Sequence, residues 1–472
     1  MALRRLPAAL SAAATAATAA VAAAVLVTAL AAPAAVSVAD VWAEPYTVPG
    51  AAPTPAPLLV TQDGRALAFP ASDRSPAAPA GAVTEILPLD LATGAPNGAI
   101  RGLGLASVQA VAYSRDHYVL AGSTLDARGT ISDRSHVQVG YGTGGGDIGP
   151  LKGIAGSTGR HAFALAANDD GVIAIVIGNT TERRLLIRRP NGRGFVQAFS
   201  AKVGSQGRGA TVAVGAKGDV LMAWENAHHI YARHVGPSGS VGAVHHVGDG
   251  VQSHLQAAVE AGGRLLIAWV SQRVDEGEAA SPATVSFVTA APGKAFNKAR
   301  TLESVGPTGA GRYVSDPAVR LVTGGASLIA WTGYDAASSH YVVRVAQIDG
   351  GRLGPAQTVS SAAVNAVLGD LAVEDGGGAA LVWRTGVAGA DADGSGMQTI
   401  GFARRETPAM AFGASETVTA ASTAAAGSTS PGWSFPFSPR VALQPRTGAA
   451  LVEIGIFAGT SSRFSIAARR EP

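Results

Sequence analysis

The sequence predicts an all-β protein built from repeated units of four short antiparallel strands. The first observation is composition: 60 of the 472 residues are glycine and only 15% are charged, which favours many turns over long helices. The second is a phrase that recurs along the chain, an alternating apolar segment followed by a glycine-rich turn and a dense apolar run. The third is that four of the six tryptophans stand at the end of this phrase.

Residues 1–39 carry the features of an export signal. Arg4 and Arg5 precede an alanine-rich apolar run, and the small residues Ser37 and Ala39 suit cleavage before residue 40. An uncleaved N-terminal anchor is the alternative, because the run is longer than most signal cores. We expect a secreted, extracytoplasmic protein with a single domain over residues 40–472. It would contact a membrane only if the segment stays uncleaved.

Charge and cysteine content exclude several classes of function. The chain has no cysteine, so neither disulfides nor thiolate metal sites are available to an exported protein. The formal net charge falls from +3 to +1 when Arg4 and Arg5 are removed with the signal. The remaining basic residues are scattered, which argues against nucleic acid as a partner.

The recurring phrase marks eight units. Its dense run is apolar on both faces, as expected of a strand that lies between neighbouring sheets. A tryptophan at its end can bury about 200 Å² there. The clearest copies are TVAVGAKGDVLMAW (211–224), QAAVEAGGRLLIAW (256–269), AVRLVTGGASLIAW (318–331) and LAVEDGGGAALVW (371–383), and weaker copies cover 58–69, 108–122, 164–178 and 441–455.

Each unit continues into a third and a fourth strand. The third strands are similar to one another in LLIRR (185–189), IYARH (230–234) and GFARR (401–405). Fourth segments follow after a turn, as in LGPAQTVS (353–360) and FGASETVT (412–419). Short turns between consecutive strands are typical of antiparallel meanders. Four-stranded units in this number favour a β-propeller, with eight blades rather than seven.

The two ends of the chain are expected to share the last blade. The final unit stops at its third strand, SSRFSIAARREP (461–472). The segment VWAEPYTVPG (41–50) has the form of the missing fourth strand. An N-terminal strand that completes the last blade would close the ring without a disulfide.

Long loops are expected on one face of the ring, which we call the loop face. Connections from strand two to strand three, and from strand four into the next blade, lie on the same side of an antiparallel blade. The insertions fall almost wholly in these connections, and such loops usually carry recognition. A cover over the channel is the alternative role for the aromatic loop 432–439. The candidate ligand-binding residues are Arg312, Tyr313, Trp433, Phe435 and Phe437.

A second group of candidates is expected around the mouth of the central channel. His254, Asp316, Asp370 and Arg440 each stand eight positions before a turn glycine, so each should begin an innermost strand. Two carboxylates, an imidazole and a guanidinium could bind a sugar or an organic acid, or perform acid–base catalysis. The alternative is structural, because such side chains also bond to turn amides and to neighbouring backbone.

Two further segments suggest metal chemistry. DADGSG (391–396) places Asp391, Asp393 and Ser395 at alternate positions, as calcium loops do, but the twelfth position is Phe402 instead of glutamate. A plain turn is the alternative, and calcium is the one cofactor suggested. Six histidines crowd residues 228–254, yet we expect them spread across one blade and its neighbour in solvent-facing or capping roles, not gathered into a ligand set. Adjacent histidines on a strand point to opposite faces, so a zinc or copper site is not expected.

The chain resembles uncharacterised secreted β-propeller repeat proteins of GC-rich bacteria. The resemblance rests on AVRLVTGGASLIAW and the following VVRVAQIDGGRLGPAQTVS, and it implies the propeller fold without an activity. Sialidase Asp-boxes and the Trp-Asp endings of WD40 repeats are missing from the sequence. A quinoprotein-like element, LDLATGAP (89–96), occurs only once.

No catalytic motif points to a reaction. We expect a non-enzymatic scaffold that binds an extracellular glycan, a cell-envelope component or a protein through its loop face. The first alternative is a carbohydrate-active hydrolase or lyase that uses Asp316 and Asp370, with His254 or Arg440 assisting. The second is a structural envelope protein.

Overall fold

The computed structural model describes residues 42–469 with several gaps. The described residues belong to one compact unit, Val38–Pro472. Among them, no helix has the length and apolar character needed to cross a membrane. The gaps are residue 50, 52–55, 73–82, residue 115, 127–130, residue 145, 205–208, 251–253, 272–282, 306–316, 323–324, 386–397, 422–438, 445–446 and 459–460.

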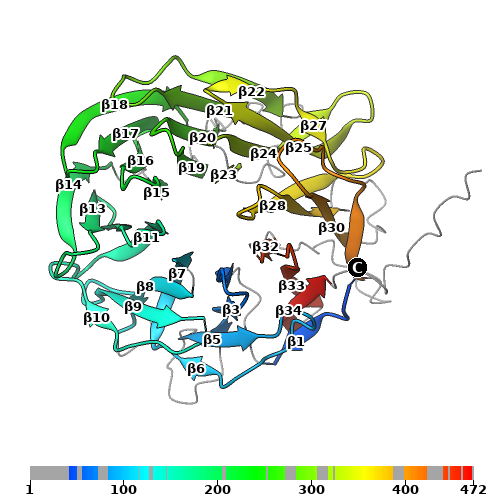
Figure 1. Ribbon diagram of the computed structural model, residues 1–472, viewed down its shortest axis with the longest axis horizontal. Helices are drawn as coiled ribbons and strands as arrows, with labels where there is room; N and C mark the ends of the chain where they lie inside the picture. Colours follow the sequence, from blue (N-terminus) through cyan, green and yellow to red (C-terminus); the bar gives the residue numbers. More distant parts are fainter. Residues whose placement is uncertain are drawn as a thin grey trace, which may run out of the picture. The chain divides into compact units, whose positions relative to one another are not determined.

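The strands form eight antiparallel sheets, which we call blades I to VIII, and Figure 1 shows them following one another in a ring. Blade I contains β2 (Leu58–Val60), β3 (Ala66–Ala68), β4 (Ala71–Ser72), β5 (Val83–Leu89) and β6 (Arg101–Gly102), and blade II contains β7 (Leu105–Tyr113), β8 (His117–Thr124), β9 (Val137–Thr143) and β10 (Lys152–Gly153). Blade III contains β11 (His161–Ala167), β12 (Ile173–Gly178), β13 (Glu182–Arg188) and β14 (Val196–Lys202). Blade IV contains β15 (Ala210–Val214), β16 (Val220–Asn226), β17 (His229–Val235) and β18 (Val241–Asp249).

Blades V to VIII follow the same order, and the first strand of each lies innermost (Figure 1). Blade V contains β19 (His254–Val259), β20 (Leu265–Ser271), β21 (Ala283–Ala290) and β22 (Arg300–Val305), and blade VI contains β23 (Ala318–Leu321), β24 (Ser327–Asp335), β25 (His340–Asp349), β26 (Arg352–Leu353) and β27 (Gln357–Thr358). Blade VII contains β28 (Ala366–Val373), β29 (Ala379–Thr385), β30 (Gln398–Arg405) and β31 (Glu416–Ala421). Blade VIII contains β32 (Arg440–Leu443), β33 (Ala450–Ala458), β34 (Ser461–Arg469) and the N-terminal strand β1 (Tyr46–Val48). The predicted eight-bladed propeller is confirmed.

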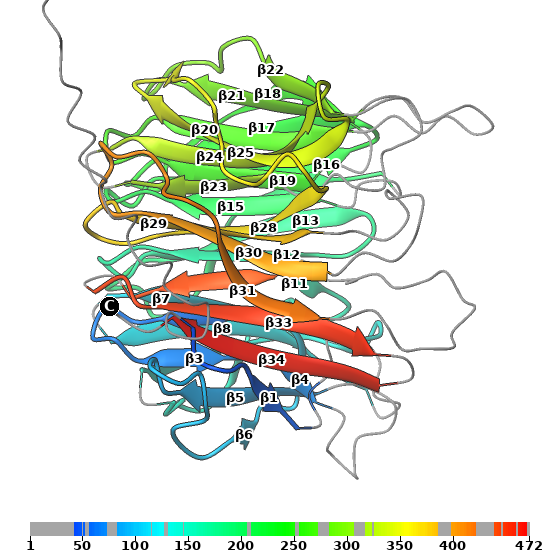
Figure 2. The same ribbon diagram turned by 90° about the vertical axis from the view of Figure 1, so that its right-hand side faces the viewer.

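The N-terminal strand completes the last blade, as predicted. β1 pairs antiparallel with β34, with Thr47 opposite Ser465. The backbone amide of Ala43 extends the pairing by donating to the carbonyl of Ala468 at 2.8 Å. Figure 2 shows β1 beside β34 at the edge of the ring. The first and last described segments of the chain are therefore joined in one sheet.

A tight turn joins the first strand to the second strand in the blades whose turn residues are all described. In blade IV, the amide of Gly215 donates to the carbonyl of Asp219 at 2.8 Å. Gly218 occupies the left-handed region there with φ of 81°, a conformation that costs glycine little. This recurring backbone conformation explains the glycine in the repeated sequence phrase.

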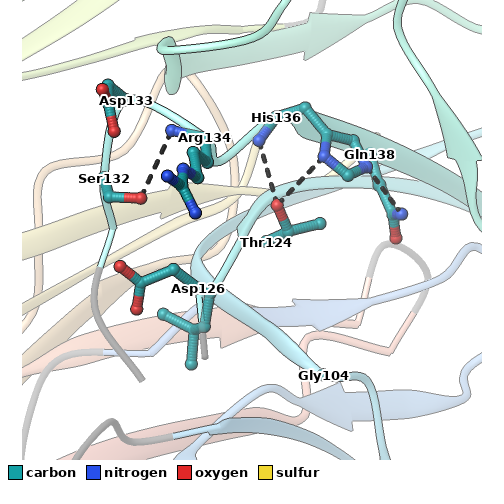
Figure 3. Close-up of a pocket in the computed structure, with 9 residues that line it drawn as sticks. Gly104, Thr124, Asp126, Ser132, Asp133, Arg134, His136 and Gln138 are labelled. Atoms are coloured by element: carbon teal, nitrogen blue, oxygen red, sulfur yellow. Dashed lines mark hydrogen bonds between the residues drawn. The ribbon is translucent and has the colours of Figure 1, made fainter. Parts of the chain in front are cut away.

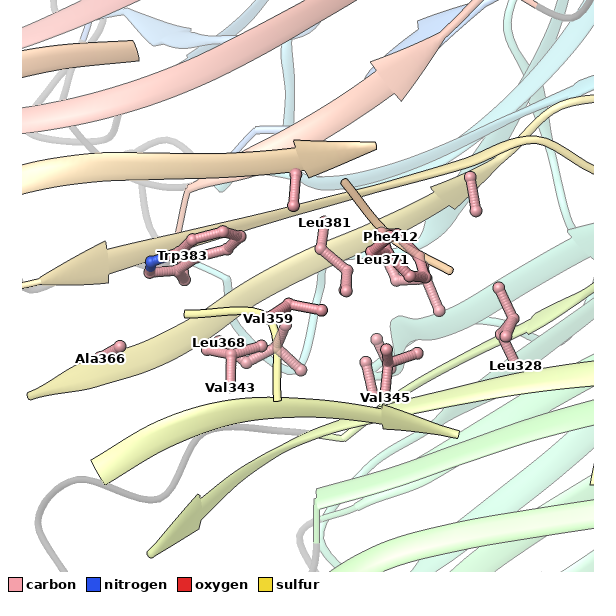
Figure 4. Packing of buried hydrophobic residues seen from close by; sticks show 14 of the residues in the cluster. Leu328, Val343, Val345, Val359, Ala366, Leu368, Leu371, Leu381, Trp383 and Phe412 are labelled. Atoms are coloured by element: carbon pink, nitrogen blue, oxygen red, sulfur yellow. The ribbon is translucent and has the colours of Figure 1, made fainter. Parts of the chain in front are cut away.

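Hydrophobic clusters fill the interfaces between neighbouring blades. Among the described residues there are eight clusters, and each joins two adjacent blades, including blades VIII and I. Figure 4 shows the cluster of blades VI and VII, where Trp383 of β29 packs with Leu368. Trp383 is 1% exposed, and Trp224, Trp269 and Trp331 are buried at the equivalent position. The prediction that these tryptophans lie between sheets is confirmed.

Candidate functional site

The innermost strands of seven blades line a cavity of about 820 Å³ in the channel at the centre of the ring. Most of the residues in its wall are neutral: they are apolar, apart from Gln109, Thr211 and Gln256. The charged side chains gather on one side, on blades VI to VIII. They are Arg320 of β23, Asp370 of β28, Arg384 of β29 and Arg440 of β32.

Asp370 is held by three neighbouring groups. Its Oδ1 accepts a hydrogen bond from Nη2 of Arg320 at 2.9 Å and one from the amide of Leu371 at 2.8 Å. Its Oδ2 accepts from the amide of Val441 in blade VIII at 3.5 Å. The side chain is 11% exposed, so the carboxylate binds three blades together and offers little free surface to a ligand. This is the structural alternative that the sequence left open.

The prediction that Asp370 begins its strand was wrong. β28 starts at Ala366, and a bulge after Leu368 separates the two parts of the strand. Gly369 forms this bulge, and a Cβ atom there would lie 2.5 Å from the carbonyl oxygen of Pro439. The strand therefore extends further toward the loop face than the repeat phrase indicated.

Arg440 begins β32 as predicted, and it is exposed in the channel wall. Its guanidinium forms no hydrogen bond or ion pair with the described part of the chain. On the neighbouring strand β33, its backbone partner is Glu453. Among the described residues, Arg440 is thus a charged group at the channel without a hydrogen-bond or ion-pair partner.

Glu453 lies behind Arg440 and was missed by the sequence reasoning. It is 3% exposed, and its Oε1 accepts a 2.9 Å hydrogen bond from the amide of Ala56 in front of β2. Its Oε2 is buried without a hydrogen-bond partner among the described residues. Burial raises the pKa of Glu453 to about 8, although the Ala56 amide and the Arg440 charge act in the opposite direction. The carboxyl is therefore largely protonated at neutral pH.

A signal for Glu453 exists in the sequence. It is the one charged residue in the apolar run ALVEIGIF (450–457). Ala223, Ala268, Ala330 and Val382 occupy the equivalent position in blades IV to VII, and each is buried. A carboxyl group at a position that is apolar in blades IV to VII indicates a specialised role in blade VIII.

Arg384 adds a further positive charge to this side of the channel. It follows Trp383 near the end of β29, and burial lowers its pKa below the usual value for arginine. Asp370 already balances Arg320. Because Glu453 is largely neutral, the described charged residues of blades VI to VIII in this wall carry an excess of positive charge.

The other predicted site residues are not placed by the structure. β19 begins at His254, but its side chain lies outside the described residues. The remaining candidates also lie outside the described residues; they are Arg312, Tyr313, Asp316, Asp391, Asp393, Ser395, Trp433, Phe435 and Phe437.

A second polar cavity of about 820 Å³ lies beside the connection from β8 to β9 in blade II (Figure 3). His136 is fixed there, because its ring contacts Thr124 Oγ1 at 3.2 Å and Gln138 Nε2 at 3.1 Å. Asp133 and Arg134 also line this cavity. This cavity is lined by both acidic and basic side chains, whereas the described charged residues at the channel are mainly basic.

The prediction for the histidines was wrong in one respect. His245 and His246 do diverge, and His245 packs on Phe296 of the neighbouring blade with ring centroids 5.7 Å apart. His229 and His246, however, converge on Asp249. Their ligand atoms lie within 4.8 Å of one another, so three of the crowded polar residues do form a group.

Comparison with known proteins assigns the chain to no family. No family model matches the chain, and no curated protein matches it. Among solved structures, the Dos1 propeller is 7% identical with a TM-score of 0.46, covering 90% of this chain and 94% of that one. The ulvan lyase described as a new polysaccharide lyase family, PL25, is 11% identical with a TM-score of 0.43, covering 76% and 94%. The WD40 domain of SCAP from fission yeast is 9% identical with a TM-score of 0.43, covering 90% and 98%.

Proposed function

We propose that this protein is an exported propeller that binds a carboxylate-bearing glycan at the loop-face mouth of its channel. The observation that carries the proposal is the one-sided charge of the channel wall. Arg440 is exposed there without a partner in the described structure, beside a second arginine and a buried, largely neutral Glu453. A guanidinium is suited to bidentate contacts with a carboxylate.

The neutral state of Glu453 supports an anionic ligand. An ionised Glu453 carboxylate would form an ion pair with the Arg440 guanidinium and would repel an anionic ligand. Burial keeps Glu453 protonated at neutral pH, since its pKa is raised to about 8. The positive charge of Arg440 therefore remains available to a ligand in the channel.

The rest of the cavity suits a sugar. A volume of about 820 Å³ is in the range of cavities that hold small ligands. Gln109, Thr211 and Gln256, on blades II, IV and V, offer neutral donors and acceptors for hydroxyl groups in the wall outside the arginine-bearing blades. An extracellular glycan with uronic acid units combines these two chemistries. Contacts from the loop residues Arg312, Tyr313, Trp433, Phe435 and Phe437 stay a prediction.

Binding is favoured over hydrolysis or elimination by the state of Asp370. A general base needs a lone pair directed at the substrate. Both Asp370 oxygens instead accept hydrogen bonds from Arg320 and from backbone amides. A catalytic role for the channel residues is therefore an outcome of the test and not the proposal.

The proposal is tested by calorimetric titration of the purified protein with trigalacturonate and, as matched control, galactotriose. We expect saturable binding of trigalacturonate that weakens as salt is added, and at least about tenfold weaker binding of the neutral sugar. Equal binding of the two sugars, or none, would contradict the proposal. Release of unsaturated or shortened sugars during incubation would instead favour a lyase or a hydrolase.

A further inference from the structure

A group of three polar side chains lies on the outer part of blade IV, away from the channel. Nδ1 of His229 is 2.6 Å from Oδ1 of Asp249, and Nε2 of His246 is 2.9 Å from the same oxygen. The two imidazole rings are 5.2 Å apart and nearly perpendicular. Two nitrogens and one carboxylate oxygen therefore face a common point.

A bulge in β18 creates this arrangement. In a regular strand, residues i and i+3 point to opposite faces of the sheet. His246 pairs with Tyr231 and Gly248 pairs with Ile230, so Val247 is an extra residue on the β18 side. The bulge restores His246 and Asp249 to the same face, where His229 on β17 stands opposite Asp249.

Packing holds the two imidazoles in place from the protein side. The Tyr231 ring lies 5.6 Å from His246 and 6.4 Å from His229. Tyr231 itself stacks on the buried Trp224 at 6.0 Å, between blades III and IV. The two imidazoles thus rest on an aromatic stack that continues into the core, although the three side chains are 50% to 72% exposed.

We propose that His229, His246 and Asp249 bind one divalent transition-metal ion, with Zn²⁺ as the reference ion. Two imidazoles and one carboxylate form a ligand set that zinc accepts, and calcium prefers oxygen ligands. Ligand atoms bound tetrahedrally at 2.0–2.2 Å lie about 3.3–3.6 Å from one another. The present N–O distances of 2.6 Å and 2.9 Å need only a small outward adjustment to admit the ion.

The ion would replace the two hydrogen bonds on Asp249 by two metal–nitrogen bonds and one metal–oxygen bond. It would link the third strand of blade IV to its outermost strand. With three protein ligands on an exposed surface, further positions stay open to water or to a donor group of a partner. The site lies outside the channel, so it does not depend on the proposed glycan binding.

The test is calorimetric titration of untagged, chelator-treated protein with Zn²⁺. We expect one saturable site in the wild type. We expect His246→Ala and Asp249→Asn to weaken Zn²⁺ binding by at least the roughly 10–100-fold that loss of an outer hydrogen-bond partner of a metal ligand costs. Zn²⁺ should raise the melting temperature of the wild type but not that of these variants, because an ion that binds only the folded state stabilises it.

His117→Ala is the matched control. His117 forms an exposed pair with Asp116 at the same 2.6 Å but is not part of the three-residue group. We expect this variant to bind Zn²⁺ like the wild type. The proposal is overturned if His246→Ala keeps wild-type affinity while folding normally by melting temperature without metal, or if the wild type shows no saturable Zn²⁺ site.

Discussion

The backbone amide of Ala56 donates a 2.9 Å hydrogen bond to Oε1 of Glu453, which connects the first blade to the last behind the channel wall. The bond ties the start of β2 to the centre of β33. It belongs to the interface that closes the ring, where Val60 and Leu451 also pack in one cluster. The buried carboxyl group of Glu453 thus has two roles: it links the first blade to the last, and its protonation state affects the charge near Arg440 in the channel wall.

Glu453 should make the stability of the protein depend on pH. The native state keeps the proton between the usual pKa of 4.5 and about 8, whereas the unfolded chain releases it. Stability should therefore fall as pH rises through this window, by about 1.4 kcal/mol per pH unit from this group. Glu453→Gln cannot ionise and should remove that slope. The measurement is the free energy of unfolding as a function of pH for the variant and the wild type. Parallel profiles would contradict a raised pKa of Glu453 in the folded state.

Ring closure can be tested with a designed disulfide. Thr47 and Ser465 are backbone partners, and their side-chain oxygens are 3.1 Å apart. The double variant Thr47→Cys with Ser465→Cys should form a disulfide within the monomer, because the chain has no other cysteine that could compete. The disulfide should raise the free energy of unfolding by about 2–4 kcal/mol, because it constrains the unfolded chain. Mass spectrometry and thermal unfolding measure both effects.

The matched control for the disulfide moves the second cysteine along the same strand. Thr47→Cys with Ser461→Cys places the partner four residues away, about 13 Å along β34. This pair should stay reduced or form dimers. Equal intramolecular oxidation of the two pairs would show that β1 has no fixed register on β34.

Trp383 should be essential for the interface of blades VI and VII. It is 1% exposed and packs in their shared cluster. Trp383→Ala should cost about 3–5 kcal/mol in denaturant-induced unfolding, because it leaves a cavity. Met410→Ala, at a residue 53% exposed, should change stability by about 0.5 kcal/mol or less. Similar losses for the two variants would contradict the described packing.

Asp370→Asn separates binding from catalysis. The amide keeps an acceptor for the backbone but loses the charge that pairs with Arg320. We expect a loss of about 1–3 kcal/mol in stability. We also expect tighter binding of trigalacturonate, since the wall becomes more positive. Abolished turnover of a polysaccharide substrate in this variant would instead identify Asp370 as a catalytic group.

The repeated features of the fold were predictable from sequence, because each blade packs between two similar neighbours and therefore needs the same kinds of residue at equivalent positions. Gly218 and its equivalents mark the first turn, and Trp383 and its equivalents mark the space between sheets. Individual departures were harder to predict. Pro70 lies between β3 and β4 and divides the second strand of blade I, and the outer strand of blade VI is formed by the short β26 and β27.

The site was only partly predictable, because its geometry depends on irregular backbone. Arg440 was found by its register to the turn glycine, but the bulge at Gly369 displaced the start of the strand that holds Asp370. The bulge at Val247 likewise brings His246 onto the face of Asp249, which alternation alone would forbid. Glu453 was visible as a charge in an apolar run, yet its neighbour Ala56 lies almost four hundred residues away in sequence.

The most direct test of the central claim is the affinity of Arg440 variants for trigalacturonate. Arg440→Ala should weaken binding at least about tenfold, and Arg440→Lys should restore part of it, since the charge returns without the bidentate geometry. Arg352→Ala, on the outer strand β26, should bind like the wild type. Unchanged affinity in Arg440→Ala, or an equal loss in Arg352→Ala, would contradict a carboxylate site at the channel mouth.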